Sequence, residues 1–525
     1  MNRLRMAAAC ALIAACSVPP NVSARALTMA VAAEPSSMDP LFSRTQNNQQ
    51  VENIFERLIA RDENLQIQPG LAVGWRVVDP TTWEFKLRPN VRFQDGTPFT
   101  ADDVVYSVKR ASNVPNSPAP FSGAVANIAS IDIPDPLTLR IHTKSPAPGF
   151  LEQIGMLFIV SRHAAEGHQS NQYVSPAVAV GTGPYKLTRW VPGDHLDLAR
   201  NDDYWGPKPP FETITVRFVA NDAARMSALL SGSVDLIDNV PPINVPRLKR
   251  EPAVTLYSGP SARLIYLALD SSRKQSPFVT GPDGEPLQSN PLRDLRVRQA
   301  ISKMIDRTAI TRYLLNGAGV PAGQIVPQGM GGYSPALQAD AYDPAGAKKL
   351  LAQAGYPRGF TLTIHSSNDR FSSDGDVAQA VGQMLARGGI RIANVVTQPY
   401  NVYAGAAAKQ SYSAFIFSFG NTSSDSTIAL SNVMATYSRS AGKGAFNRAR
   451  YSNPVLDHAL AAAGASFDPE QRERLLEQAA EAGFRDLGIV PLYFPENFWA
   501  TRNGVTFHPN KAEYTTATYV GIQEK

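Results

Sequence analysis

The stretch that decides the fold is residues 70–111, which read GLAVGWRVVDPTTWEFKLRPNVRFQDGTPFTADDVVYSVKRA. Apolar and polar residues alternate over 83–87, a pattern that predicts a half-buried β-strand. A proline-containing turn and a glycine-containing turn follow. Thr100 and Asp103 then form a capping-box pattern, which predicts a helix that begins after Thr100. The stretch therefore predicts strands, turns and a capped helix in close succession.

Two later segments each predict a strand–helix–strand unit. The first has a strand at 213–219, a helix at 222–230 that ends at Gly232, and a strand at 234–237. The second has a strand at 360–364, a helix at 376–385 and a strand at 390–396. Between them, residues 292–315 carry apolar residues at helical spacing and predict one long amphipathic helix. Two separated α/β units predict two lobes with a mixed sheet in each, and a cleft between lobes is a common ligand site.

Composition narrows the class of protein. The chain has 525 residues, which is too long for one ordinary domain. Hydrophobic residues are 43% and charged residues 18%, as in a globular protein, and 41 prolines argue against a helical bundle. After the first 26 residues, 47 basic side chains face 45 acidic ones and no basic run occurs. A nucleic-acid-binding protein is therefore not expected.

The first 26 residues predict an export signal. Residues 1–5 are polar and basic, 6–15 form a short apolar run, and the small-residue site Ala24-Arg25-Ala26 follows. The run is about half the roughly 20 residues that span a bilayer. Cleavage after Ala26 gives a free periplasmic protein without cysteine, and the strand-like run that begins next favours this site. Residues 13–16 also resemble a lipobox, and cleavage before Cys16 gives a lipid-anchored protein.

Motifs of known catalytic chemistry are absent from the sequence. Neither G-x-S-x-G nor G-x-x-x-x-G-K-[ST] occurs, so no nucleophile elbow and no P-loop is predicted. The seven histidines are scattered and H-E-x-x-H is missing, so no metal site is predicted. We therefore assign no catalytic residue, no cofactor and no metal ligand. A secreted α/β hydrolase is the enzymatic alternative, and it predicts a nucleophile–base pair in the cleft.

Four segments taken together resemble one family. They are AAEPSSMDP (32–40), the stretch 70–111, GTGPYKLTRW…ARNDDYWG (181–206) and LRDLRVRQAISKMIDR (292–307). In this order and spacing they resemble the extracellular solute-binding proteins of family 5, the dipeptide, oligopeptide and nickel-binding class of ABC importers. The resemblance covers nearly all of the chain after the export signal.

The resemblance implies an α/β periplasmic binding protein with two lobes, mixed sheets, a hinged cleft and three segments. Domain I would be discontinuous (27–62, 178–262 and 495–525), domain II would be an insertion (63–177), and domain III would form the second lobe (263–494). The resemblance also implies capture of a peptide or small-molecule ligand by hinge closure. Delivery would be to an ABC permease and its ATPase at the inner membrane, and we expect a monomer.

The resemblance places a ligand determinant in the loop SFGNTSSD (418–425). Peptide binders of this family often carry an acid here, after a Gly-Trp pair, that pairs with the amino group of the peptide. In this chain Phe419 replaces the tryptophan and Thr422 stands where the acid would be. Asp425 matches a later acid and serves either as a loop cap or, in a rearranged loop, as the anchor. Because Thr422 carries no charge, the loop predicts a changed specificity.

Further ligand candidates follow from position in the resemblance. Most lie at strand ends or on aromatic walls, and the arginines suit a ligand carboxylate. A structural role is the alternative for each of them. With the loop residues, the candidates are Glu34, Arg263, Asn368, Arg370, Tyr400, Tyr403, Phe417, Phe419, Asn421, Thr422 and Asp425.

The leading hypothesis is a non-enzymatic binding component of an importer. Its solute would be a peptide, or a small amide- or carboxylate-bearing molecule such as an opine or a modified amino acid. A glycoside or a metal chelate is the less favoured solute. A sensory protein that presents its ligand to a receptor remains a further alternative, because the same closure serves both roles.

Overall fold

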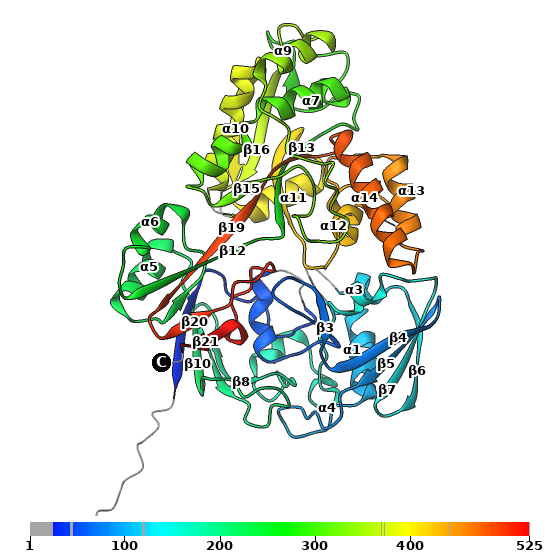
Figure 1. The fold of residues 1–525 in the computed structure, drawn as a ribbon, viewed down its shortest axis with the longest axis vertical. Helices are drawn as coiled ribbons and strands as arrows, with labels where there is room; N and C mark the ends of the chain where they lie inside the picture. The colour runs from blue at the N-terminus through cyan, green and yellow to red at the C-terminus, as the bar shows by residue number, and fades with distance from the viewer. Residues whose placement is uncertain are drawn as a thin grey trace, which may run out of the picture.

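The computed structural model describes residues 25–42, 46–117, 121–368, 370–371, 373–439 and 441–523. The predicted export signal, apart from its last two residues, and Cys16 lie outside these residues. The chain folds into two lobes, one above the other in Figure 1. Among the described residues, no helix combines the length and the apolar character that crossing a membrane requires.

The first lobe is built around β1 (Ala26–Val31), which pairs in parallel with β10 (Thr213–Phe218) and β11 (Leu236–Ile237). Two antiparallel strands extend this sheet, β9 (His195–Arg200) and β8 (Tyr185–Val191). Helix α5 (Asp222–Ser231) joins β10 to β11, is capped by Asn221, and ends at Gly232 with φ +78°. The first predicted strand–helix–strand unit is therefore confirmed, although its last strand is shorter than predicted.

Residues 70–111 supply two strands of a separate antiparallel sheet. The strand order of this sheet is β4 (Ala72–Asp79), β5 (Thr82–Leu87), β7 (Thr138–Thr143) and β6 (Ile128–Asp135). The predicted strand is β5. The predicted helix is α1 (Ala101–Ala111), with its capping box formed by Thr100 and Asp103. Smaller elements of this lobe are η1 (Gln46–Asn53), β2 (Ile59–Arg61), β3 (Ile67–Pro69), α2 (Ser122–Val125), α3 (Phe150–Ile154), α4 (Arg162–Ala165), η2 (Ser170–Val174), η3 (Pro242–Asn244), α6 (Val245–Leu248), β20 (Val505–Phe507), η6 (Ala517–Tyr519) and β21 (Val520–Ile522).

The second lobe has a mixed sheet with helices on both faces. Its strands, in order, are β14 (Val279–Thr280), β16 (Thr361–Ser367), β18 (Ala414–Gly420) and β13 (Arg263–Leu269), with β17 (Arg391–Gln398) beside β16. Alternate residues of β13 enter opposite cores, Ile265 and Leu267 on one face and Leu264 and Tyr266 on the other. The helices are α7 (Leu295–Met304), α8 (Arg307–Ala309), α9 (Pro344–Gln353), α10 (Asp374–Gly388), α11 (Tyr400–Ala408), α12 (Thr427–Val433), α13 (Pro454–Ala463) and α14 (Pro469–Arg485).

The second predicted strand–helix–strand unit is confirmed as β16, α10 and β17, and β16 and β17 are parallel. The single long helix predicted at 292–315 is wrong. The segment breaks into the 3-10 turn η4 (Pro291–Arg293), α7, α8 and the π-helical turn η5 (Ile310–Leu314). Ile305 is extended (φ −93°, ψ 112°), and Asp294 and Asp306 each cap a new helix start. Side-chain caps of this kind compete with helix continuation, which apolar spacing alone does not show.

One long strand, β19 (Val490–Arg502), connects the lobes (Figure 1). Its first half pairs with β13 of the second lobe and with β15 (Gly319–Pro321). Its second half pairs with β12 (Val254–Pro260) and with β11 of the first lobe. The chain crosses a second time between β12 and β13, where Ser261 N donates to Pro495 O at 3.0 Å. The lobes are therefore joined by two adjacent crossings.

A buried ion pair ties the segment after β1 to helix α1. Arg110 donates to both carboxylate oxygens of Asp39, at 2.8 and 2.6 Å, and the Asp39 side chain is fully buried. Ser170 and the amide of Leu41 complete the hydrogen bonding of that carboxylate. Asp39 belongs to the AAEPSSMDP segment, so this part of the sequence pattern has a structural role.

We expect Arg110→Ala to lower the free energy of unfolding by about 3–5 kcal/mol, because it leaves the Asp39 carboxylate buried without its cation. Arg162→Ala is the matched control, since its ion pair with Glu166 is exposed and should contribute less than about 0.5 kcal/mol. Urea unfolding followed by tryptophan fluorescence measures both. Equal losses in the two variants would contradict the assignment.

A second buried carboxylate makes stability depend on pH. Asp238 accepts a hydrogen bond from Ala32 N and lies 3.6 Å from Arg225, but burial raises its pKa to about 6. The folded protein therefore holds this proton while the unfolded chain, with a pKa near 3.8, releases it. Stability from this group is present at low pH and is lost as pH rises from about 4 to about 6.

Relative to Asp238→Asn, we expect the wild-type protein to lose about 3 kcal/mol of unfolding free energy between pH 4 and pH 7. Urea titrations at several pH values measure this difference. Asp283→Asn is the control, because Asp283 is paired only at the surface, with Arg358. A wild-type-minus-Asn difference that is flat with pH would show that Asp238 is ionised throughout.

Candidate ligand-binding site

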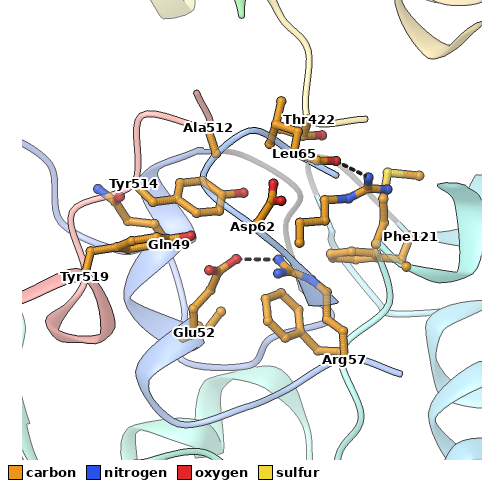
Figure 2. A pocket seen from close by; sticks show the side chains of 15 residues that line it. Gln49, Glu52, Arg57, Asp62, Leu65, Phe121, Thr422, Ala512, Tyr514 and Tyr519 are labelled. Carbon is orange, nitrogen blue, oxygen red and sulfur yellow. Dashed lines mark hydrogen bonds and ion pairs between the residues drawn. The ribbon is translucent and has the colours of Figure 1, made fainter. Parts of the chain in front are cut away.

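A cavity of about 110 Å³ lies where four parts of the chain meet. Its walls come from η1 and β2, from the segments around α2 and α3, from the C-terminal stretch after β19, and from the β18–α12 loop. Figure 2 shows these side chains around the common space. Thr422 is the wall residue that the second lobe supplies, so this pocket lies between the lobes.

Opposite charges line the pocket in close pairs. The Arg57 guanidinium lies 2.5 Å from a Glu52 carboxylate oxygen and 3.8 Å from the centre of the Phe158 ring. Burial lowers the pKa of Arg57, but the charge of Glu52 opposes this, and the net shift is upward. Arg57 therefore stays protonated and, together with the Glu52 carboxylate beside it, presents a polar pair to the cavity.

A hydroxyl and a carboxylate face the same space in Figure 2, those of Tyr514 and Asp62. Burial raises the pKa of Tyr514 to about 12, so this phenol stays neutral and can both donate and accept a hydrogen bond. Asp62 accepts from the amides of Asn64 and Gln66 at 2.9 Å. The two side chains give the pocket polar groups that suit a polar solute.

A hydrogen-bonded bridge joins the two lobes next to Arg61, a residue of the pocket wall. Glu152 of α3 accepts from Ser424 of the second lobe, at 2.5 Å from the hydroxyl and 3.3 Å from the amide. The same carboxylate pairs with Arg61 of β2 at 2.6 Å. The Glu152 side chain is only 7% exposed, so this bridge joins the lobes through a largely desolvated charge. Nothing in the sequence pattern marked Glu152, because its partners are distant in the chain.

In the 418–425 loop, one residue faces the pocket and others form bonds within the protein. Thr422, the predicted ligand residue of this loop, lines the pocket. Asn421 is buried and holds the loop, with its amide nitrogen 2.8 Å from the Asp425 carbonyl. The Asp425 carboxylate pairs with Arg472 at 2.6 Å and accepts from Thr427 N. Asp425 thus has the bonds of a loop cap, which was one of its two predicted roles.

Glu34 and Arg263 have partners within the protein. The Glu34 carboxylate accepts from Trp190 Nε1 at 3.2 Å and from Gly193 N at 2.9 Å, both in the β8–β9 hairpin. Arg263 pairs with Glu513 at 2.8 Å, and each side chain is 12% exposed. This second pair joins the start of β13 to the C-terminal segment that lines the pocket.

The predicted aromatic residues gather on one face of β18. Tyr403 is buried and stacks on Phe417 at 5.5 Å, and its hydroxyl donates to the Ile416 carbonyl. Tyr400 is partly buried and lies 6.0 Å from Phe417. Phe419 is also partly buried, and its ring contacts Phe446 at 5.7 Å. Tyr403 and Phe417 are therefore core side chains, whereas Tyr400 and Phe419 are partly accessible.

Two arginines border this aromatic face. Arg370 lies 4.9 Å from the Tyr400 ring, and Asn368 beside it is exposed. Arg448 lies 3.9 Å from the Phe417 ring centre and was not predicted, because it falls in a stretch with no motif. Within the described ranges, no cluster of three or more histidine, cysteine, aspartate or glutamate side chains is arranged to hold a metal ion.

Two lobes on paired strand crossings, with a pocket walled by both lobes, define a solute-binding protein. A family model described as bacterial extracellular solute-binding proteins, family 5 Middle, matches residues 66–442. The chain therefore belongs to this family, and the resemblance inferred from the four sequence segments is confirmed. The expected two-lobed α/β fold is confirmed as well.

Known relatives extend over almost the whole chain. The glutathione-binding protein GsiB of Salmonella typhi is 29% identical over 495 residues, 92% of this chain and 92% of that protein. GsiB of Escherichia coli K12 is 28% identical over 503 residues, 92% of this chain and 91% of that protein. Two solved structures of other binding proteins share the fold.

The binding protein MoaA of A. tumefaciens R10, in complex with mannopinic acid, is 26% identical with a TM-score of 0.77. The match covers 96% of this chain and 100% of MoaA. The periplasmic protein DppA of Helicobacter pylori, in complex with the peptide STSA, is 24% identical with a TM-score of 0.77. That match covers 95% of this chain and 98% of DppA.

Loss of the charge at Glu152 should open the lobes. We expect Glu152→Gln to shift the closure equilibrium about ten- to hundredfold toward the open form, because hydrogen bonds to a charged group become neutral ones. Small-angle X-ray scattering of the ligand-free protein should then show a larger radius of gyration. Ser424→Ala is the companion variant, since it removes a bond between the lobes and keeps the Arg61–Glu152 pair. An unchanged radius in both variants would contradict a bridging role.

Proposed function

We propose that this protein is the binding component of an ABC importer and captures a peptide or a small carboxylate-bearing solute between its lobes. The observation that carries the proposal is the pocket whose wall includes Thr422 of the second lobe and ionised groups of the first. Such a wall is complete only when the lobes are together. Binding energy from the solute therefore favours the closed form.

The cavity volume sets a condition on capture by closure. The closed lobes leave about 110 Å³, less than the several hundred Å³ of a typical small-molecule site. A solute of peptide size therefore enters when the second lobe (domain III, 263–494) swings away from domains I and II. Hinge motion about a few residues at element ends is the usual form of such closure.

The relatives favour an acidic solute. The proteins at 28–29% identity are named for glutathione, a tripeptide with two carboxylates. The solved relative at 26% identity holds mannopinic acid, an opine. Thr422 provides no charge for a peptide amino group, which favours a solute that is held through its carboxylates. An opine or modified amino acid is therefore a second candidate beside a peptide.

The remaining parts of the proposal follow from the family. The protein would act in the periplasm, as a free form or as a form anchored at Cys16, and would deliver its solute to a membrane permease driven by an ATPase. It would work as a monomer and without catalysis. The motifs that match the family hold the scaffold together, as Asp39 with Arg110 does, and contribute no nucleophile–base pair.

Binding is tested by calorimetry on residues 27–525 after unfolding and refolding to remove bound solute. We expect saturable binding of glutathione or mannopinic acid, and no binding of sucrose. A solute at about 100 times its dissociation constant should stabilise the fold by about 2.7 kcal/mol. A protein that binds sucrose, and neither acid, would contradict the proposed solute class.

The role of Thr422 is tested with Thr422→Asp in the same assay. Because an added carboxylate can pair with an amino group, the variant should prefer free peptides over N-acetylated ones, whereas the wild type should discriminate less than tenfold. Equal discrimination by both proteins would place Thr422 away from the amino group of the solute.

A further inference from the structure

Arg448 lies in the segment between α12 and α13, on the aromatic face of β18. The backbone there is fixed by Asn447, whose amide nitrogen donates to the carbonyls of Ala435 and Tyr451 at 2.9 and 2.7 Å. The Arg448 guanidinium lies 3.9 Å from the centre of the Phe417 ring and 5.6 Å from that of Phe446. The side chain is therefore held in place by its backbone and by ring contacts.

The guanidinium has N–H groups for which the described part of the chain provides no acceptor. Nε and Nη1 of Arg448 are buried and have no hydrogen-bond partner among the described residues. Desolvating a donor without a partner costs free energy, and more for a charged group. An unsatisfied buried group in a folded protein calls for a cause, such as a partner that binds later.

Arg448 differs from other arginines that have an unpartnered buried nitrogen, because it forms no ion pair with a carboxylate of the described residues. Within the part of the chain that the structure describes, four arginines have a buried side-chain nitrogen without a partner: Arg57, Arg225, Arg448 and Arg472. Three of them form an ion pair with a carboxylate: Arg57 with Glu52, Arg225 with Asp222, and Arg472 with Asp425. No carboxylate of the described residues lies within 4.0 Å of the Arg448 guanidinium, so its charge has no close counter-ion.

Ring contacts connect Arg448 to the end of β18 that leads to the pocket: Arg448 lies near the Phe446 ring, which contacts Phe419 at 5.7 Å. Its ring partner Phe417 belongs to an apolar cluster that also contains Leu65, and Phe419 and Ala512 pack against that cluster. Leu65 and Ala512 line the pocket. Phe419 is partly exposed, and Thr422 on the pocket wall follows it by three residues. A solute in the pocket that extends along this face would therefore approach Arg448.

We propose that Arg448 is the anchor for a carboxylate of the captured solute, beside a wall formed by Phe419 and Tyr400. This inference rests on the proposed function and deepens it by naming the group of the solute and the residue that receives it. A carboxylate is the fitting partner because it accepts from a guanidinium through two parallel hydrogen bonds. Contact with Phe417 restrains the guanidinium before the solute arrives, which reduces the entropy lost on binding.

The chain offers a matched control two residues away. Arg450 also lies over an aromatic ring, at 3.6 Å from the centre of Tyr437, but its Nη1 donates to the Asn447 carbonyl. Arg448→Met and Arg450→Met remove the same charge and keep an unbranched side chain that packs against a ring. The two variants therefore separate a missing counter-ion from a loss of packing.

The binding arm uses glutathione and its ethyl esters in calorimetry. We expect wild-type protein to lose about ten- to hundredfold in affinity on esterification of the anchored carboxylate. Arg448→Met should bind the acid weakly and no longer distinguish it from the ester, whereas Arg450→Met should behave as wild type. Full discrimination in Arg448→Met would overturn the proposal.

The stability arm needs no solute and separates the two levels of inference. Because Nε and Nη1 of Arg448 are buried without an acceptor among the described residues, Arg448→Met should leave the urea midpoint of the free protein unchanged or raise it. Arg450→Met should lower the midpoint, because it removes a hydrogen bond to the Asn447 carbonyl. A lower midpoint in Arg448→Met than in Arg450→Met would assign Arg448 a structural role and overturn the proposal. Wild-type protein that binds neither glutathione nor mannopinic acid would instead contradict the proposed solute class, and the stability arm alone then decides on Arg448.

Discussion

The pairing of β19 with strands of both lobes is the constraint on which the rest of the structure depends. One half of β19 completes the sheet of the second lobe and the other half completes that of the first. Beside it, the chain returns between β12 and β13. A hinge motion at these two adjacent crossings would leave the strand pairing within each lobe intact. The pocket lies close to this axis, because the C-terminal stretch that follows β19 lines it.

Contacts next to the two crossings hold the C-terminal stretch of the pocket wall in place. Lys511 N donates to the Glu63 carbonyl at 2.9 Å, and Ala262 N donates to the Lys511 carbonyl at 3.2 Å. Arg263 adds an ion pair with Glu513. These bonds hold the C-terminal stretch, with Tyr514 of the pocket wall, against both the hinge and the first lobe. An arginine that the sequence suggested for ligand contact thus has a protein partner that positions the pocket.

The sequence predicted local elements well where capping and alternation coincide. Strand β5 and helix α1 follow from alternating residues and from the box of Thr100 and Asp103. The long helix at 292–315 failed because Asp306 starts a new helix within an apolar repeat that continues. For the site, the loop position of Thr422 was predictable from its resemblance to a family pattern. Glu152 and Arg448 were not, since their significance arises only from partners, or missing partners, far away in the chain.

The segments that identified the family are mainly structural. Glu56, which is partly buried, accepts from Tyr204 at 2.9 Å and from Trp205 at 2.8 Å, and desolvation raises its pKa. The Tyr-Trp pair of the 181–206 segment is thereby bound to the first lobe. Arg307, at the end of the 292–307 segment, donates to the Pro491 carbonyl at 2.7 Å and so ties α8 to β19. These residues hold the scaffold and its hinge together. They therefore identify the family but do not indicate which solute is bound.

The charges around the β18–α12 loop underlie the proposal for which end of a solute the second lobe holds. Thr422 is neutral, and Asp425 is engaged by Arg472 and by the amide of Thr427. The loop therefore has no unpaired acid to receive an amino group. On the neighbouring face, the cation of Arg448 has no counter-ion within ion-pair distance among the described residues. A positive wall of this kind would attract carboxylates and repel ammonium groups, which is the reason for proposing that the second lobe holds the acidic end of its solute.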